Sequence, residues 1–317
     1  MSSEPIIGID LGTTNSCAAW VDGYKDGQPN VKLIPYKGGE YTIPSIFAID
    51  DKGNELIGYE AKRQWQLNPR NTIYGSKRLV GRSATSDIVE AMKKVVQYGV
   101  KPSHDNKEVT IEIARKDMTL QDVAARILNK IRDVASNHLK QPVNKAVVTV
   151  PAYFSDRQRQ SVKDAGRMIG LEVVRIINEP TSAALAYGLG KQLNQRVCIY
   201  DLGGGTFDVS VIEIRNQVFE VKSTGGDIFL GGIDFDNAMI HYVLQEFEAK
   251  TGIDLSTDPV AMQRIKDLAE RTKIDLSARE EAPFNIPFIT MTPQGQPLNI
   301  EMKFNRKLLE KLTSEQV

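Results

Sequence analysis

The chain has 317 residues, 41% of them hydrophobic and 25% charged, which is an ordinary composition for a globular protein with room for two domains. Its 40 Lys and Arg residues balance 40 Asp and Glu residues, so net charge gives no support to nucleic-acid binding. No apolar run is long enough to span a bilayer, and no signal-like segment precedes the first predicted strand. We therefore expect an intracellular protein whose two cysteines, Cys17 and Cys198, are buried reduced thiols.

The first predicted element is a strand that ends at Asp10 and is followed by a short polar turn and a second strand. The turn contains Gly12, Thr13, Thr14 and Asn15. Small residues at such a turn allow backbone N–H groups to approach an anion, and the threonines add hydroxyl groups. The segment therefore predicts a phosphate-binding hairpin with a carboxylate beside it.

The middle of the chain predicts strands that alternate with capped helices. Thr119 to Asp122 and Ser155 to Gln158 resemble helix N-terminal capping patterns, and Gly170 is a plausible helix stop. Buried strands are expected at 146–150 and 173–177, and helices at about 61–67, 119–139, 155–169 and 179–188. Strands connected by helices in this way predict mixed sheets covered by helices.

A second hairpin, predicted at 197–214, repeats the pattern of the first. Asp201 ends its first strand, 191 residues after Asp10, and Gly203–Gly205 and Thr206 form its turn. Asp201 and Asp208 flank this turn and could orient a hydrated Mg²⁺ ion. The repeat indicates two similar lobes that offer phosphate-binding turns to a shared cleft. A plain glycine hairpin with solvated carboxylates is the alternative for the second hairpin taken alone.

The last part of the chain predicts helices at about 234–250 and 259–277, then strands at 284–290 and 298–304. In the second of these helices, Glu270, Lys273 and Ser277 follow helical spacing and share one face. Ile265, Leu268, Ala269 and Leu276 form another, apolar face. A solvated polar face is the simple interpretation of the first set, with a ligand-binding face as the alternative.

The motifs together resemble the nucleotide-binding (ATPase) domain of the 70-kDa heat-shock chaperone family, DnaK type. The resemblance rests on Gly8–Ser16, Asn71–Arg82, Ala146–Phe154, Arg175–Thr181, Asp201–Asp208 and Gly231–Asp236. It implies a two-lobed α/β fold of the actin-like and sugar-kinase-like ATPases, with duplicated mixed β-sheets flanked by helices. Lobe I is expected at 1–190 with an inserted subdomain at about 44–118, and lobe II at 191–317 with an adenosine-side subdomain at about 234–304.

The resemblance also implies a role for each site residue. Lys77 and Glu179 are expected to act in catalysis with Asp10, Asp201 and Thr206. The expected nucleotide contacts are Gly12, Thr13, Thr14, Asn15, Gly203, Gly204, Gly205 and Thr206 for phosphate, and Glu270, Lys273 and Ser277 for adenosine. Asp10, Asp201, Asp208 and Glu179 are expected to hold Mg²⁺, mostly through water, and K⁺ is expected beside it. Pro151 and Arg159 match an allosteric relay, although on spacing alone a strand terminator and a surface helix arginine are the preferred interpretations.

The implied function is ATP binding and hydrolysis in a chaperone of protein folding and the stress response. A J-domain co-chaperone and a nucleotide exchange factor are the expected partners, client peptides would bind a separate substrate-binding domain, and neither nucleic acid nor membrane is expected. The expected location is a bacterial cytoplasm. The family domain continues past residue 317, so we expect a truncated chain with an incomplete second lobe and exposed apolar surface. The alternatives are a non-hydrolysing nucleotide-binding or scaffold fragment, a sugar kinase and an actin-like filament protein.

Overall fold

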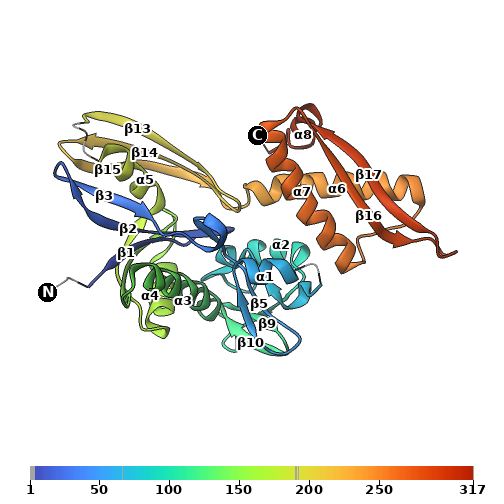
Figure 1. The fold of residues 1–317 in the computed structure, drawn as a ribbon, viewed down its shortest axis with the longest axis horizontal. Helices are drawn as coiled ribbons and strands as arrows, with labels where there is room; N and C mark the ends of the chain where they lie inside the picture. The colour runs from blue at the N-terminus through green and yellow to red at the C-terminus, as the bar shows by residue number, and fades with distance from the viewer. Residues whose placement is uncertain (1–3, 66, 190, 192, 317) are drawn as a thin grey trace. The chain divides into compact units, whose positions relative to one another are not determined.

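The computed structural model describes residues 4–65, 67–189, 191 and 193–316. It has a mixed α/β fold with several sheets flanked by helices, which confirms the predicted class (Figure 1). Contacts divide the chain into two compact units, one of Met1–Arg63 and Arg70–Ile228, the other of Gln64–Pro69 and Phe229–Val317. The lobe boundary expected at residues 190–195 stays a prediction, and Gly190 and Gln192 lie outside the described residues.

The largest sheet of the first unit brings distant parts of the sequence together. Its strand order is β12-β11-β1-β2-β3, and β4 also pairs with β2. The strands are β1 (Ile6–Asp10), β2 (Asn15–Lys25), β3 (Gln28–Leu33), β4 (Thr42–Pro44), β11 (Lys145–Val150) and β12 (Glu172–Asn178). Because β1, β11 and β12 are parallel, their carboxyl ends meet at one edge, where Asp10 lies opposite Thr149.

Two capped helices begin where the sequence predicts. They are α3 (Leu120–Leu139) and α4 (Asp156–Met168), and each begins with a complete capping box. The two helices pack against each other, and α3 buries Val123, Ile127 and Ile131 on one face (Figure 1). Gly170 follows α4 with a positive φ of 71°, a backbone conformation that glycine adopts without a Cβ clash.

A third helix, α5 (Glu179–Gly188), connects the large sheet to a second one. It contacts β11 and β12 on one side and, on the other, the sheet formed by β13 (Gln195–Leu202), β14 (Phe207–Arg215) and β15 (Val218–Asp227) (Figure 1). Ala184 packs with Ile212 and Ile214 at this contact. The first residue of α5 therefore lies between the edges of two sheets.

The inserted part of the first unit consists of two small sheets and short helices. One sheet has the order β6-β5-β7, from Glu55–Ile57, Phe47–Ile49 and Thr72–Ile73. The other has the order β10-β9-β8, from Lys116–Thr119, Val109–Ile113 and Gly99–Pro102. The helices are α1 (Tyr59–Gln64), α2 (Asp87–Val95), and the 3₁₀ turns η1 (Lys37–Gly39), η2 (Pro69–Asn71) and η3 (Ser76–Leu79). The α1 helix begins and ends earlier than the segment predicted at 61–67, of which Gln66 lies outside the described residues.

The second unit has its own core between three helices and a hairpin. Its elements are α6 (Gly232–Thr251), α7 (Pro259–Ala278), β16 (Glu281–Met291), β17 (Pro297–Asn305) and α8 (Arg306–Leu312). The predicted apolar face of α7 is buried against Phe284 and Phe304, both fully inaccessible to solvent. None of the described helices in either unit is both long enough and apolar enough to cross a membrane.

The prediction that both cysteines are buried is wrong. Cys17 is half-buried, and Cys198 is exposed. On β13, Val197 and Ile199 face the small core beneath α5, so the strand alternation turns Cys198, Tyr200 and Leu202 to the opposite face. Tyr200 is 68% exposed there, so this face of the sheet presents apolar side chains to solvent.

Candidate functional site

The first unit contains a cavity of about 420 Å³ where the two predicted phosphate-binding turns meet. This volume lies within the range of small-molecule sites in proteins. The cavity is lined by Asp10, Gly12, Thr13, Thr14, Asn15, Lys77, Thr149, Glu179, Ser182, Ala183, Asp201, Gly203, Gly204, Gly205 and Thr206. Residues separated by 191 positions in the sequence therefore line one cavity, as the repeat predicts.

The two turns lie so close together that the glycines of the second turn are required for space. A Cβ added at Gly204 would lie 1.9 Å from Thr14 Oγ1, and one added at Gly205 would lie 2.5 Å from Thr13 Cγ2. None of Gly203–Gly205 has a positive φ. The turn therefore does not need glycine for an unusual φ, but it does need glycine because the side chains of Thr13 and Thr14 approach so closely.

An ion pair between Lys77 and Glu179 lies at the wall of the cavity. Lys77 Nζ is 2.7 Å from Glu179 Oε1, and the two side chains are 12% and 15% exposed. Burial raises the pKa of Glu179 above its ordinary value, an effect that the neighbouring Lys77 charge opposes and the Asp10 and Asp201 charges increase. The pair joins η3 to the first residue of α5, which are far apart in the sequence.

Three further carboxylates lie at the strand ends beside the pair. Asp201 and Asp208 are directly opposite each other on β13 and β14, and burial raises the pKa of both. Asp10 Oδ1 accepts a hydrogen bond of 2.9 Å from Thr149 Oγ1. Facing carboxylates in a partly buried site repel each other, and a bound cation would relieve that repulsion.

Two unpaired polar atoms are found here, one on Thr14, which lines the cavity, and one on Asp208, which does not. Asp208 Oδ1 and Thr14 Oγ1 are buried without a hydrogen-bond partner. Within the described part of the chain, no group of three or more His, Cys, Asp or Glu side chains is close enough to hold a metal ion directly. The donor set nevertheless suits Mg²⁺, which is usually held through its own water molecules by one or two carboxylates and by phosphate oxygens.

The two residues predicted as a relay lie on one side of this site. Arg159 Nη2 donates to Asn178 Oδ1 at 2.8 Å and to Ala152 O at 3.2 Å, and its Nε donates to Phe154 O at 3.0 Å. Arg159 therefore ties the turn that begins at Pro151 to the residue immediately before Glu179. Arg159 lies on α4 and is half-buried, and its role in a relay stays a prediction.

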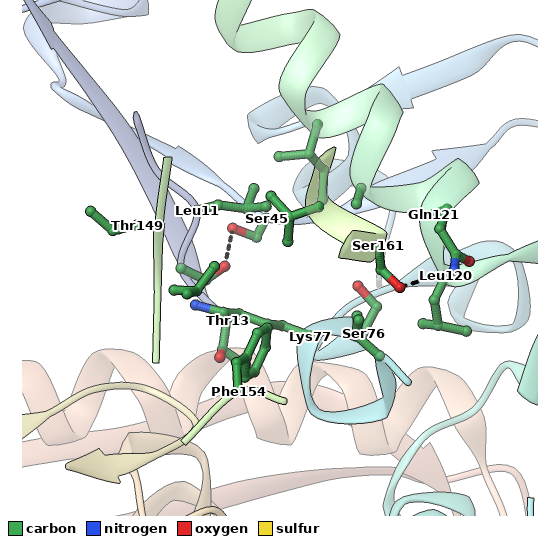
Figure 2. Close-up of a pocket in the computed structure, with 16 residues that line it drawn as sticks. Leu11, Thr13, Ser45, Ser76, Lys77, Leu120, Gln121, Thr149, Phe154 and Ser161 are labelled. Carbon is green, nitrogen blue, oxygen red and sulfur yellow. Dashed lines mark hydrogen bonds between the residues drawn. The ribbon is translucent and has the colours of Figure 1, made fainter. Parts of the chain in front are cut away.

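Four residues at the cavity or at its turns were not predicted from the sequence as site residues, because only tertiary contacts bring them to this place. Thr149 and Ser182 line the cavity, and Ser45 and Arg78 hold its turns from outside. A smaller cavity of about 30 Å³ lies beside the first turn, and Figure 2 shows Ser45 and Thr13 among the residues that line it. The position of Thr149 could have been predicted, since it lies near the carboxyl end of a predicted buried strand and such strand ends meet at the site.

The predicted adenosine residues lie in the second unit, on α7. Glu270 and Lys273 are half-buried, and Ser277 is exposed. Lys273 Nζ lies 2.9 Å from Asp236 Oδ1 and donates to Gly232 O at 2.8 Å, so α7 is attached to the start of α6. Their role in binding adenosine stays a prediction.

A comparison with known families gives a match that spans nearly the whole chain. Residues 6–317 match the family model HSP70, which is described as Hsp70 protein. The match extends over both turns of the cavity, the Lys77–Glu179 pair and the helices of the second unit. It is therefore not confined to one glycine-rich motif.

Proposed function

Because the chain belongs to the Hsp70 family, whose members are chaperone ATPases that bind ATP or ADP with Mg²⁺, we propose that it binds and hydrolyses ATP. Its mixed α/β architecture is consistent with the actin-like ATPase fold of that family. In finer detail, we assign it to the DnaK type, as a module whose nucleotide state controls a peptide-binding domain. The observation that carries the proposal is the meeting of two glycine- and threonine-containing turns around the Lys77–Glu179 pair.

The cavity offers what phosphoanhydride hydrolysis requires from a protein. Backbone N–H groups of the two turns would bind the phosphate chain, and the Lys77 ammonium would offset charge that develops on the transferred phosphoryl group. Glu179, with its raised pKa, would orient the attacking water through a hydrogen bond. Thr206, on the second turn, would contact the phosphate chain with its hydroxyl.

The carboxylates at the strand ends would hold the cations. Asp10, Asp201, Asp208 and Glu179 would bind the water shell of Mg²⁺, with K⁺ beside the phosphates. When bound, Mg²⁺ would neutralise phosphate charge and orient the phosphate chain of ATP for in-line attack. The unpaired Asp208 Oδ1 and the facing Asp201 support this assignment.

The remaining residues are assigned to recognition of adenosine and to signalling. Glu270, Lys273 and Ser277 would contact adenosine from one face of α7. Pro151 and Arg159 would report the nucleotide state, which the Arg159 contact to Asn178, beside Glu179, supports. A J-domain co-chaperone and a nucleotide exchange factor would then regulate hydrolysis and exchange. A bacterial cytoplasm is the location that the DnaK-type motifs favour.

The decisive experiment measures ATP binding and turnover with the same protein samples. Mg·ATP is titrated by calorimetry against the wild type, Lys77→Ala, Glu179→Gln and the control Lys52→Ala, an exposed turn residue. Loss of a group that acts on the transferred phosphoryl typically costs about 10²–10³ in turnover. We therefore expect such a loss in the two site variants, with ATP affinity retained within about tenfold, and no change in the control.

Other results of the binding and turnover measurements would support one of the alternative functions. Binding by the wild type without any turnover would mean a non-hydrolysing nucleotide-binding protein. Turnover that requires an added sugar would mean a kinase, and sedimentation that depends on ATP would mean a filament protein. No detectable binding of ATP or ADP would overturn the proposed function.

A further inference from the structure

Ser45 holds the first phosphate-binding turn from the side opposite the large cavity. This residue lies between β4 and β5 and is 5% exposed. Its Oγ donates to Gly12 O at 2.8 Å, and its backbone N–H donates to Thr14 O at 2.8 Å (Figure 2 shows the Oγ bond). Ser16 Oγ lies 2.8 Å from Ser45 Oγ. Because the single hydroxyl proton of Ser45 is directed at Gly12, Ser16 must be the donor of this second bond.

Arg78 holds the second turn in the same manner. Its side chain is buried, at 8% exposure for the whole residue, and its Nε donates to Gly205 O at 2.8 Å. Its Nη2 donates to the same carbonyl oxygen. Arg78 follows Lys77 on the 3₁₀ turn η3, where successive side chains diverge by about a third of a turn. One turn of backbone therefore directs Lys77 to Glu179 and Arg78 to the second phosphate-binding turn.

Fixing a carbonyl group also fixes the N–H group of the next residue. A trans peptide is planar, and its C=O and N–H bonds point in opposite directions. No cis peptide bond occurs among the described residues. The carbonyls of Gly12, Thr14 and Gly205 are directed at Ser45 and Arg78, so the N–H groups of the residues that follow them are directed away from these two side chains.

The lining of the cavities shows which side each holding residue occupies. Gly12, Thr13 and Thr14 line the large cavity and Ser45 does not; Ser45 lines the small cavity beside the first turn, together with Gly12 and Thr13. Thr206 also lines the large cavity and Arg78 does not; Arg78 lines a separate small pocket, together with Thr13 and Thr206. Because Ser45 and Arg78 lie outside the large cavity, N–H groups of Thr13, Asn15 and Thr206 that are directed away from them would face a phosphate chain in that cavity, where their partly positive ends would meet its negative charge.

We propose that Ser45 and Arg78 are positioning residues that orient the peptide groups of the two phosphate-binding turns, with the carbonyl oxygens directed away from the large cavity and the N–H groups directed toward it. Neither side chain lines the large cavity, so each acts through a backbone carbonyl that it turns away from the ligand. Without these contacts, a peptide could rotate and direct a carbonyl oxygen at the phosphates. The inference rests on the proposed function and adds a testable condition: affinity for phosphate groups depends on the two residues, and affinity for adenosine does not.

The test compares a ligand with phosphates and a ligand without them. Mg·ADP and adenosine are each titrated, by competition against a fluorescent adenine nucleotide, on the wild type, Ser45→Ala, Arg78→Gln and the double variant. Removing one hydrogen bond that orients a charged ligand's donors changes affinity by about tenfold. We expect the Kd of ADP to rise by about that factor in each single variant and by about its square in the double variant, because the two residues hold different turns.

Three controls separate positioning from general damage. Arg70→Gln and Ser223→Ala replace exposed residues of the same types and should leave both affinities unchanged. Arg78→Lys keeps one donor for Gly205 O, so it should recover part of the ADP affinity, and it carries the test if Arg78→Gln fails to fold. The unfolding temperature of every variant is measured without ligand.

The outcomes are distinguishable. ADP affinity equal to that of the wild type in both variants overturns the inference, and so does a loss of adenosine affinity as large as the loss for ADP. A wild type that binds no ADP overturns the proposed function, and the inference with it. A selective loss of ADP affinity with partial recovery in Arg78→Lys supports both.

Discussion

At the scale of single residues, a buried charge lowers the stability of the folded protein unless an opposite charge or a bound ion compensates it. At the candidate site, the pKa of Asp201 and of Asp208 is raised mainly by burial, and the two residues lie opposite each other on β13 and β14. Such an arrangement destabilises the protein without ligand and favours a cation between the strands. Lys266 on α7, in the second unit, is a partly buried charge whose pKa is lowered by burial.

Lys266→Met tests the cost of that buried charge. Burial lowers the pKa of Lys266 from 10.5 to about 8, so the folded protein holds the charged form at an unfavourable free energy of at most about 3 kcal/mol. Between pH 8 and 10.5 the unfolded chain binds more protons than the folded one, so the stability of the wild type should rise with pH in that window. We expect the variant to be about 1–3 kcal/mol more stable at pH 7, with a gain that shrinks as pH approaches 10.5.

The measurement is urea unfolding at pH 7, 8.5 and 10 for the wild type and for Lys266→Met. Lys307→Met, at an exposed position on α8, is the matched control and should show no gain at any of these values. A Lys266→Met gain that stays constant with pH would mean that packing, and not charge, is responsible.

At the level of single elements, local sequence determines the helix ends, and tertiary contacts determine what the turns require. The capping patterns at Thr119 and Ser155 predicted helix starts that the structure has, because a capping box is satisfied within four residues. The spatial need for Gly204 and Gly205 depends on Thr14 and Thr13, residues far away in the sequence. Pattern alone could not distinguish this need from a need for an unusual φ.

Two adjacent glycines of β15 test whether a glycine can be required for space alone, without an unusual φ. A Cβ at Gly226 would lie 2.2 Å from the backbone oxygen of Phe207, whereas a Cβ at Gly225 would meet nothing closer than Val209 Cγ1 at 4.0 Å. Neither glycine has a positive φ. A backbone atom cannot rotate away, so we expect Gly226→Ala to lower the free energy of unfolding by about 2–3 kcal/mol. Gly225→Ala should change it by less than about 0.5 kcal/mol.

Chemical unfolding of the two alanine variants beside the wild type provides the comparison. Equal effects of the two substitutions would show that β15 moves away from β14 at little cost, contrary to the tight pairing in the structure. Because the glycines are neighbours on one strand, their difference does not depend on strand propensity.

For the whole molecule, the sequence predicted the two turns that line the cavity better than the side chains that hold these turns from outside. The motif around Asp10 and the motif around Asp201 are readable because each forms one continuous segment. Ser45 and Arg78 contact these turns across 33 and 127 residues, so no local spacing could reveal them. The exposed face of Cys198 was missed for a related reason, since strand alternation does not say which face of a sheet is covered.

The division of the chain into two compact units leads to a prediction about folding. The second unit encloses a core of its own, in which Phe284, Phe304 and Ile265 are fully buried among α6, α7 and the β16–β17 hairpin. A unit with an independent core should fold without the rest of the chain. We expect an isolated fragment of residues 229–317, which holds all of this core and omits only the segment 64–69 of the unit, to have the helix content of α6–α8 and to unfold in one cooperative transition.

Circular dichroism during heating tests this expectation, and Phe304→Ala in the same fragment supplies the internal control. Removing a fully buried phenylalanine costs about 3–5 kcal/mol, which is a large part of the stability of so small a domain. The transition should therefore be lost or strongly lowered in that variant. A fragment that shows helix content but melts gradually, with or without Phe304, would mean that its core forms only when the first unit is covalently attached. The two compact units would then be one cooperative folding unit, and a substitution such as Lys266→Met would stabilise the whole chain and not its second unit alone.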